Sequence, residues 1–214
     1  MPVWTVLVPV KELAIAKTRL SRFAGPARAD LALAFAVDAV SAALATEGVG
    51  AVLVVTDDPL VAEDVSAAGA DVVADEPAGG LNPALVHGVA VGLARYGPGP
   101  VAALSADLPA LRPADLALAL RVASGLPRCF VADVEGTGTT FLSSRDGAGL
   151  EPSFGHRSRA RHAASGAVEL VEPLVSLRRD VDTEVDLYDA VRLGVGPRTR
   201  AVLDGLGTGP SGGG

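Results

Sequence analysis

The chain has 214 residues, enough for one sizeable hydrophobic core, and 49% of them are hydrophobic, which excludes a disordered chain. The formal net charge of −7 argues against a nucleic-acid partner, and the single cysteine, Cys129, excludes an internal disulfide framework. Charges or prolines interrupt every apolar run before it could cross a membrane, and no basic region precedes the first run. We therefore expect a cytoplasmic protein with no membrane partner. We expect one domain over residues 1–207 and a flexible Gly/Ser/Pro tail over residues 208–214.

The first half of the chain alternates apolar runs of strand length with helical patterns. We expect strands over residues 3–8, 51–56, 71–74 and 100–104, and helices over residues 26–45, 59–68, 83–96 and 112–124. This alternation predicts a three-layer α/β/α sandwich with a mostly parallel sheet.

Two helix starts in this half carry polar side chains. Asp58 precedes Pro59 and is predicted to cap a helix, while Asp57 stays ambiguous. Asn82, the single asparagine, precedes Pro83 and is well placed for the same role. The alternative is functional: the backbone at Gly79 and Gly80 would approach a planar ligand such as a base.

The only lysines, Lys11 and Lys17, lie in one loop with Arg19, directly after the first predicted strand. Lysine is a compact charge suited to phosphate, and this loop falls at the carboxyl edge of the sheet. It lacks the glycine and lysine spacing of a Walker loop. A solvated amphipathic turn is the alternative to a phosphate site.

Asp107 follows the apolar run 100–104 and precedes Pro109. It therefore lies just past the carboxyl end of a buried strand, where open α/β sheets bind their ligands. A carboxylate at such a place either binds a metal or caps a turn, and the sequence favours the metal.

The second half departs from the alternation. Strands predicted over residues 128–134 and 139–143 are too close for a crossover helix, so we expect an antiparallel pair. Residues 150–162 are rich in Ser, Gly and cations and start a short helix that could hold an anion. A short strand is expected over residues 168–171, and helical turns over 186–191 and 198–206. Between them, Asp180 and Asp182 share a face if the segment is extended.

Several short motifs recur in a fixed order along the chain. They are Pro9-Val10-Lys11, residues 16–21, residues 56–58, Gly80 to Leu85, residues 106–109, residues 138–140, residues 152–158, and residues 179–183 with 186–187. This ordered set resembles the guanylyltransferases of coenzyme F420 biosynthesis, which have a GT-A-like, Rossmann-like nucleotidyltransferase fold. Lysines in place of a glycine-rich first loop favour this branch over sugar-nucleotide synthesis.

The resemblance implies transfer of GMP from GTP to phosphoenolpyruvate or 2-phospho-L-lactate, with release of pyrophosphate. It implies Mg²⁺ held by Asp107 with Asp180 or Asp182, and catalytic roles for Asp107, Lys11 and Lys17. The residues assigned to the nucleotide are Lys11, Lys17, Arg19, Gly80 and Asn82, and those assigned to the acceptor are Thr140, Gly155 and Ser158.

A GC-rich composition favours an actinobacterial source and hence phosphoenolpyruvate. The alternatives are 2-phospholactate as the acceptor, a sugar or molybdopterin nucleotidyltransferase, and a noncatalytic nucleotide-binding domain of the same fold. A homodimer is one possible assembly.

Overall fold

A computed structural model of the chain describes residues 2–11, 13 and 24–207. The predicted tail and most of the lysine loop, including Lys17 and Arg19, lie outside the described residues. The strands are β1 (Trp4–Pro9), β2 (Val49–Val55), β3 (Asp71–Val73), β4 (Val101–Leu104), β5 (Arg128–Ala132), β6 (Thr139–Ser144) and β7 (Val168–Glu169). The helices are α2 (Arg28–Leu44), α3 (Pro59–Ala67), α4 (Leu81–Tyr96), α5 (Pro113–Ala123), α6 (Ser158–Ala164), α7 (Glu184–Leu193) and α8 (Pro197–Gly205), with a 3-10 turn, η2 (Gly25–Ala27), before α2.

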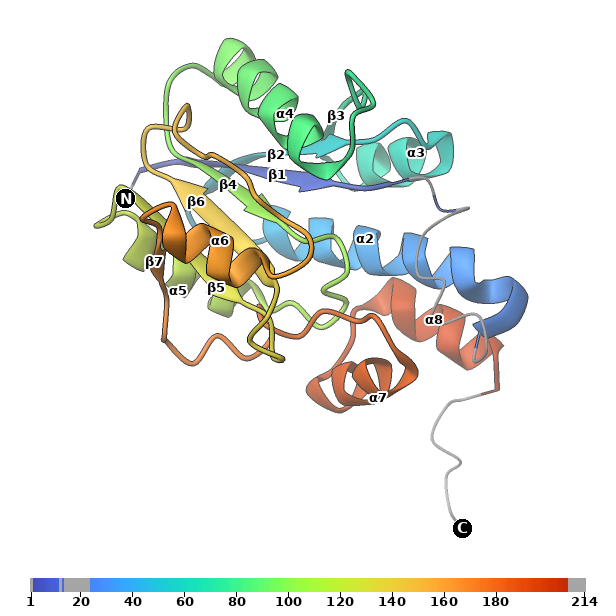
Figure 1. Cartoon of the computed structure of the whole chain (residues 1–214). Coiled ribbons are helices and arrows are strands. Elements are labelled where there is room, and N and C mark those ends of the chain that lie inside the picture. Colours follow the sequence, from blue (N-terminus) through green and yellow to red (C-terminus); the bar gives the residue numbers. More distant parts are fainter. Residues whose placement is uncertain (1, 12, 14–23, 208–214) are drawn as a thin grey trace.

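These strands form one seven-stranded sheet in the order β3-β2-β1-β4-β6-β5-β7 (Figure 1). Neighbouring strands are parallel except at β6, which is antiparallel to both β4 and β5. The mostly parallel sheet and the antiparallel pair are therefore confirmed. Because β6 runs opposite to β4, the first residues of β6 lie beside the carboxyl end of β4. The N–H of Ser105, directly after β4, donates to the Thr140 carbonyl at 2.8 Å.

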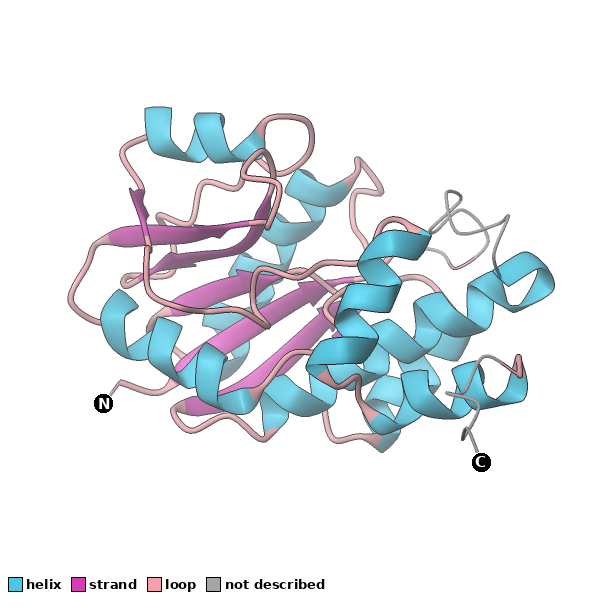
Figure 2. Ribbon diagram, turned by 90° about the horizontal axis from the view of Figure 1, so that it is seen from below, coloured by secondary structure: helices cyan, strands magenta, loops and turns pink. Residues whose placement is uncertain are grey.

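Helices cover both faces of the sheet (Figures 1 and 2). Val6 and Val8 of β1 pack with α2, α3 and α5 on one face, whereas Leu7 packs with α4 on the other. This alternation is the period of two expected of a strand buried on both faces. Helices α7 and α8 form a further cluster with Leu31 and Phe35 of α2. No helix in the described part of the chain is both long and apolar enough to span a membrane.

One predicted helix cap is confirmed and one is wrong. Asp58 Oδ1 accepts hydrogen bonds from Leu60 N–H at 3.0 Å and Val61 N–H at 3.3 Å, as expected of an N-cap. Helix α4 instead begins at Leu81, with Gly80 as its N-cap at a φ of 99°. Asn82 thus lies inside the first turn, and its amide bonds to a distant loop described below.

The end of β5 also differs from the prediction. The strand stops at Ala132, and the Val134 N–H donates to the Arg178 carbonyl at 3.0 Å. The backbone of Val134 therefore bonds to a segment of the C-terminal half, and the sheet pairing of β5 ends before it.

Helix α4 packs closely on the sheet through two glycines, and these offer a matched test. A Cβ added to Gly88 would lie 2.9 Å from Val55 Cγ2, whereas one added to Gly92 would meet Thr5 Cγ2 at 3.6 Å. Alanine favours helix by about 1 kcal/mol over glycine, so Gly92→Ala should leave the free energy of unfolding unchanged or raise it by up to that amount. Overpacking should make Gly88→Ala less stable than wild type by about 1 kcal/mol in urea denaturation. Equal stabilities of the two variants would contradict this account of the packing.

Candidate active site

A cavity of about 360 Å³ opens at the carboxyl ends of β1 and β4. Its lining comes from the residues that follow β1, from the end of β4, from α2 and α4, and from two loops of the second half. They are Pro9, Val10, Lys11, Leu13, Ala32, Phe35, Ala36, Leu81, Leu85, residues 103–107, Phe154 and Asp182. This is the edge at which open α/β sheets bind ligands, as the position of Asp107 predicted.

Two carboxylates from distant parts of the chain face this cavity: Asp107 after β4 and Asp182 before α7. A backbone hydrogen bond joins their segments, since the Val181 N–H donates to the Asp107 carbonyl at 3.0 Å. Val181 is fully buried, so the segment is also fixed by packing. Asp180 instead lines a small adjacent depression with Asp133, Glu135, Arg179, Asp182 and Asp186. Asp182 therefore lines the same cavity as Asp107 and Asp180 does not, whereas the choice of metal ligand between them stays a prediction.

The donor set suits a metal that arrives with phosphates. Among residues 2–11, 13 and 24–207, no three His, Cys, Asp or Glu side chains gather as a complete metal cage. Two carboxylates on one cavity remain, and Mg²⁺ is commonly held by one or two carboxylates together with substrate phosphates and water.

The basic side of the cavity is formed by Lys11, whose side chain is exposed and lies among its lining residues. Beyond it, Leu13 is fixed through both backbone groups. Its N–H donates to Asp58 Oδ2 at 3.0 Å, and its carbonyl accepts from Arg28 Nη1 at 3.2 Å. The second oxygen of the Asp58 cap thus anchors the chain that carries Lys11.

The apolar side of the cavity is formed by Leu81 and Leu85 of α4, Phe35 of α2, and Phe154. Gly80, predicted to approach a base, directly precedes Leu81. Asn82 makes two hydrogen bonds to the backbone of Phe154: Oδ1 accepts from its N–H at 2.7 Å, and Nδ2 donates to its carbonyl at 3.2 Å. Its amide thus ties α4 to the loop of the second half, whereas its contact with a nucleotide stays a prediction.

Of the residues predicted for the acceptor, Gly155 and Ser158 follow Phe154 in that loop and at the start of α6, whereas Thr140 lies on β6. Thr140 is buried, and its hydroxyl donates to the Leu177 carbonyl at 2.6 Å, which ties β6 to the segment that leads to Asp182. Gly155 has a φ of 105°, and its carbonyl accepts from the N–H of Ser158, the first residue of α6, at 3.0 Å. None of these three is among the residues that line the described cavity, so their contact with a substrate also stays a prediction.

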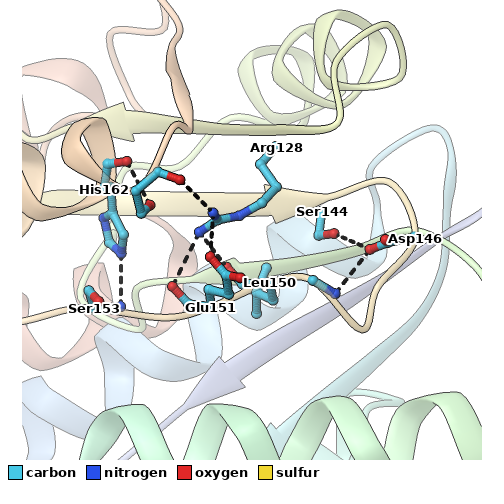
Figure 3. A network of polar contacts seen from close by, with 9 residues as sticks. Arg128, Ser144, Asp146, Leu150, Glu151, Ser153 and His162 are labelled. Carbon is cyan, nitrogen blue, oxygen red and sulfur yellow. Dashed lines mark hydrogen bonds and ion pairs between the residues drawn. The ribbon is translucent and has the colours of Figure 1, made fainter.

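A buried histidine that the sequence did not single out supports this loop (Figure 3). The Ser153 N–H donates to His162 Nε2 at 3.0 Å, so Nε2 is unprotonated and Nδ1 carries the proton 3.0 Å from the Thr139 hydroxyl. Burial lowers the pKa of His162 to about 4, and the charges of Arg128 and Arg161 add to this effect. The imidazole is therefore neutral at physiological pH.

Arg128 fixes the start of the same loop (Figure 3). Its guanidinium pairs with the Glu151 carboxylate at 2.7 Å and donates to the carbonyls of Leu150 at 3.1 Å and Ser165 at 3.2 Å. The loop is thereby attached to β5 at one end and to α6 at the other.

Comparison with known proteins places the chain in a family. The family described as guanylyl transferase, CofC like, matches residues 4–209. The chain belongs to this family. A phosphoenolpyruvate guanylyltransferase of Thermomonospora curvata is 57% identical over 200 residues, covering 93% of this chain and 88% of that protein. One of Streptomyces coelicolor is 58% identical over 201 residues, covering 93% and 95%.

Solved structures share the fold of the family member described here. A nucleotidyl transferase from Methanothermobacter superposes with a TM-score of 0.62 at 20% identity, covering 89% of this chain and 97% of that one. A CMP:2-keto-3-deoxy-manno-octonic acid synthetase complexed with CTP gives a TM-score of 0.56 at 16% identity, covering 89% and 98%. At these identities the likeness establishes the nucleotidyltransferase-like fold that the sequence predicted.

The depressed pKa of His162 predicts acid sensitivity. Its folded-state pKa of about 4 lies below the ordinary 6.5, so the unfolded chain binds more protons between these values. The free energy of unfolding should therefore fall as pH drops from about 6.5 toward 4, by at most about 1.4 kcal/mol per pH unit. The His162→Gln variant has no group that titrates at this position, so its free energy of unfolding lacks this dependence on pH. The difference in free energy of unfolding between wild type and this variant, measured by urea denaturation, should become smaller from pH 7 to pH 5. A constant difference would contradict the lowered pKa of His162.

Proposed function

We propose that this protein transfers GMP from GTP to phosphoenolpyruvate and releases pyrophosphate. The observation that carries the proposal is the pair of carboxylates, Asp107 and Asp182, on one cavity in a chain whose relatives are named phosphoenolpyruvate guanylyltransferase. A noncatalytic domain of the same fold would not need two carboxylates and a lysine on one cavity.

The reaction needs no protein nucleophile. An anionic phosphate oxygen of the acceptor attacks the α-phosphorus of GTP, a new P–O bond forms, and the bond from the α-phosphorus to the bridging oxygen breaks. Pyrophosphate leaves with that oxygen and its electron pair. Catalysis then consists of positioning two anions and stabilising the charge of the transition state.

The residues of the cavity can meet both requirements. Asp107 and Asp182 would hold Mg²⁺, and Lys11 would bind a phosphate of the nucleotide, together with Lys17 and Arg19 from the adjacent loop. Bound Mg²⁺ would neutralise phosphate charge and orient the reacting groups. The apolar wall of Leu81 and Leu85 offers a surface for the base, and Gly80 directly precedes it as the N-cap of α4.

The acceptor carries a phosphate and a carboxylate, and we place it toward Thr140, Gly155 and Ser158. Phosphoenolpyruvate is preferred over 2-phospholactate because the relatives at 57% and 58% identity carry its name. The homodimer and the cytoplasmic location expected from the sequence stay predictions.

The first test is turnover. The protein with Mg²⁺, GTP and phosphoenolpyruvate should release pyrophosphate, and Asp107→Asn should lower kcat by about 10³-fold or more while unfolding stays cooperative. Asp204→Asn, the same change at an exposed position on α8, is the control and should retain wild-type turnover. Near wild-type turnover of Asp107→Asn would exclude the metal assignment.

A panel of nucleotides and of acceptors, including 2-phospholactate, tests the substrates.

The two C-terminal aspartates should differ. Asp182 shares the cavity with Asp107 whereas Asp180 lines the adjacent depression, so Asp182→Asn should reduce kcat by about 10²-fold or more and Asp180→Asn by less than about tenfold. Steady-state kinetics at varied Mg²⁺ concentration separates a loss of metal affinity from a loss of kcat. The reverse ranking would show that Asp180 completes the site.

A further inference from the structure

The backbone of two consecutive loop residues, Ser153 and Phe154, is bound entirely by side chains. The N–H groups donate to His162 Nε2 at 3.0 Å and to Asn82 Oδ1 at 2.7 Å. The carbonyls accept from Arg161 Nε at 3.1 Å and Nη2 at 2.9 Å, and Asn82 Nδ2 also reaches the Phe154 carbonyl at 3.2 Å. We call the three side chains Asn82, Arg161 and His162 the Ser153–Phe154 clamp.

The clamp draws on two elements that are far apart in sequence. Asn82 comes from the first turn of α4, whereas Arg161 and His162 come from α6. His162 is fully buried, and the ring of Phe154 packs against it edge-on with centroids 5.1 Å apart. Both the backbone and the ring of Phe154 are therefore fixed from more than one side.

The clamped residues lie between the cavity and the predicted acceptor residues. Phe154 lines the cavity, and Gly155 follows it at a φ that favours glycine. Three residues later α6 begins at Ser158, which is itself buried. Any shift of Ser153 and Phe154 would thus move Gly155 and Ser158, which are assigned to the acceptor, whereas Leu81 and Leu85, proposed for the base, belong to α4.

We propose that His162 is a positioning residue that acts through the Ser153–Phe154 clamp to place the acceptor-binding loop against the cavity. This inference rests on the proposed function, since it names what the loop places. The imidazole of His162 contacts Thr139, Ser153, Phe130 and Phe154, and none of these four residues is assigned to the nucleotide. Its loss should therefore weaken use of the acceptor and leave GTP binding intact. Misplacement of a bound reactant by about 1 Å can cost about 10²-fold in rate.

The test compares three substitutions with wild type. His162→Leu removes the acceptor atom for the Ser153 N–H, whereas His162→Gln can restore one through its side-chain carbonyl. Ser143→Ala is the control: it removes a buried contact of the Ser143 hydroxyl with Cys129 Sγ at 3.0 Å, elsewhere in the sheet. KM for phosphoenolpyruvate, KM for GTP and the melting temperature are measured for each.

We expect His162→Leu to raise KM for phosphoenolpyruvate about tenfold or more, with less than about a twofold change in KM for GTP. His162→Gln should recover most of the loss. Ser143→Ala should lower the melting temperature without changing either KM. Equal rises in both KM values, or an unchanged KM for phosphoenolpyruvate in His162→Leu, would overturn the proposal. If His162→Leu does not fold, Arg161→Ala removes the donor to the carbonyls of Ser153 and Phe154 and should also raise KM for phosphoenolpyruvate, with little change in KM for GTP.

Amide hydrogen exchange separates this proposal from the proposed function. Exchange in the peptide of residues 150–158 should be faster in His162→Leu than in wild type and Ser143→Ala. An unchanged exchange rate would refute the clamp even if the enzyme is active. Absence of wild-type turnover would refute the guanylyl transfer, whatever the exchange shows.

Discussion

One backbone hydrogen bond, from the Val181 N–H to the Asp107 carbonyl, joins the C-terminal segment to the end of β4. The acidic side of the site depends on it, because it brings Asp182 to the cavity that Asp107 already faces. Two further bonds hold the same segment: the Thr140 hydroxyl to the Leu177 carbonyl, and the Val134 N–H to the Arg178 carbonyl. The buried Val181 side chain adds packing against Leu31 and Phe35 of α2. Backbone hydrogen bonds and apolar packing thus bring the segment that carries Asp182 to the cavity of Asp107.

Local patterns in the sequence were sufficient for the sheet and its polarity. Buried strands of Val and Leu, the Asp58-Pro59 cap and the short link between β5 and β6 each act within a few residues, so their structure follows from composition and spacing. The placement of Asp107 just past β4 followed in the same way. Contacts made over long sequence separations could not be predicted in this way. Asn82 looked like a helix cap, but its amide is used by Phe154, 72 residues away.

The site shows the same limit. Alternation in an extended segment treats Asp180 and Asp182 as equivalent, and only the folded structure distinguishes them, since Asp182 lines the cavity of Asp107 and Asp180 lines the adjacent depression. His162 gave no signal beyond its place in a segment rich in Ser, Gly and cations, because a lone histidine on a short helix is uninformative until its burial is known. The assignment of this loop to the acceptor came from the family resemblance and stays a prediction, whereas the side chains that hold the loop are seen only in the structure.

The late position of Asp182 in the chain has a consequence for biosynthesis. The first half of the chain, through α5, carries Lys11, Asp107 and the apolar residues Leu81 and Leu85 of α4. The second carboxylate joins only when the segment after β7 docks on Asp107. In the sheet order β6 lies beside β4, so the edge of β4 has no neighbouring strand until the chain has been made through β6. The pairing of β4 and the meeting of Asp107 with Asp182 at one cavity therefore both require the C-terminal half of the chain.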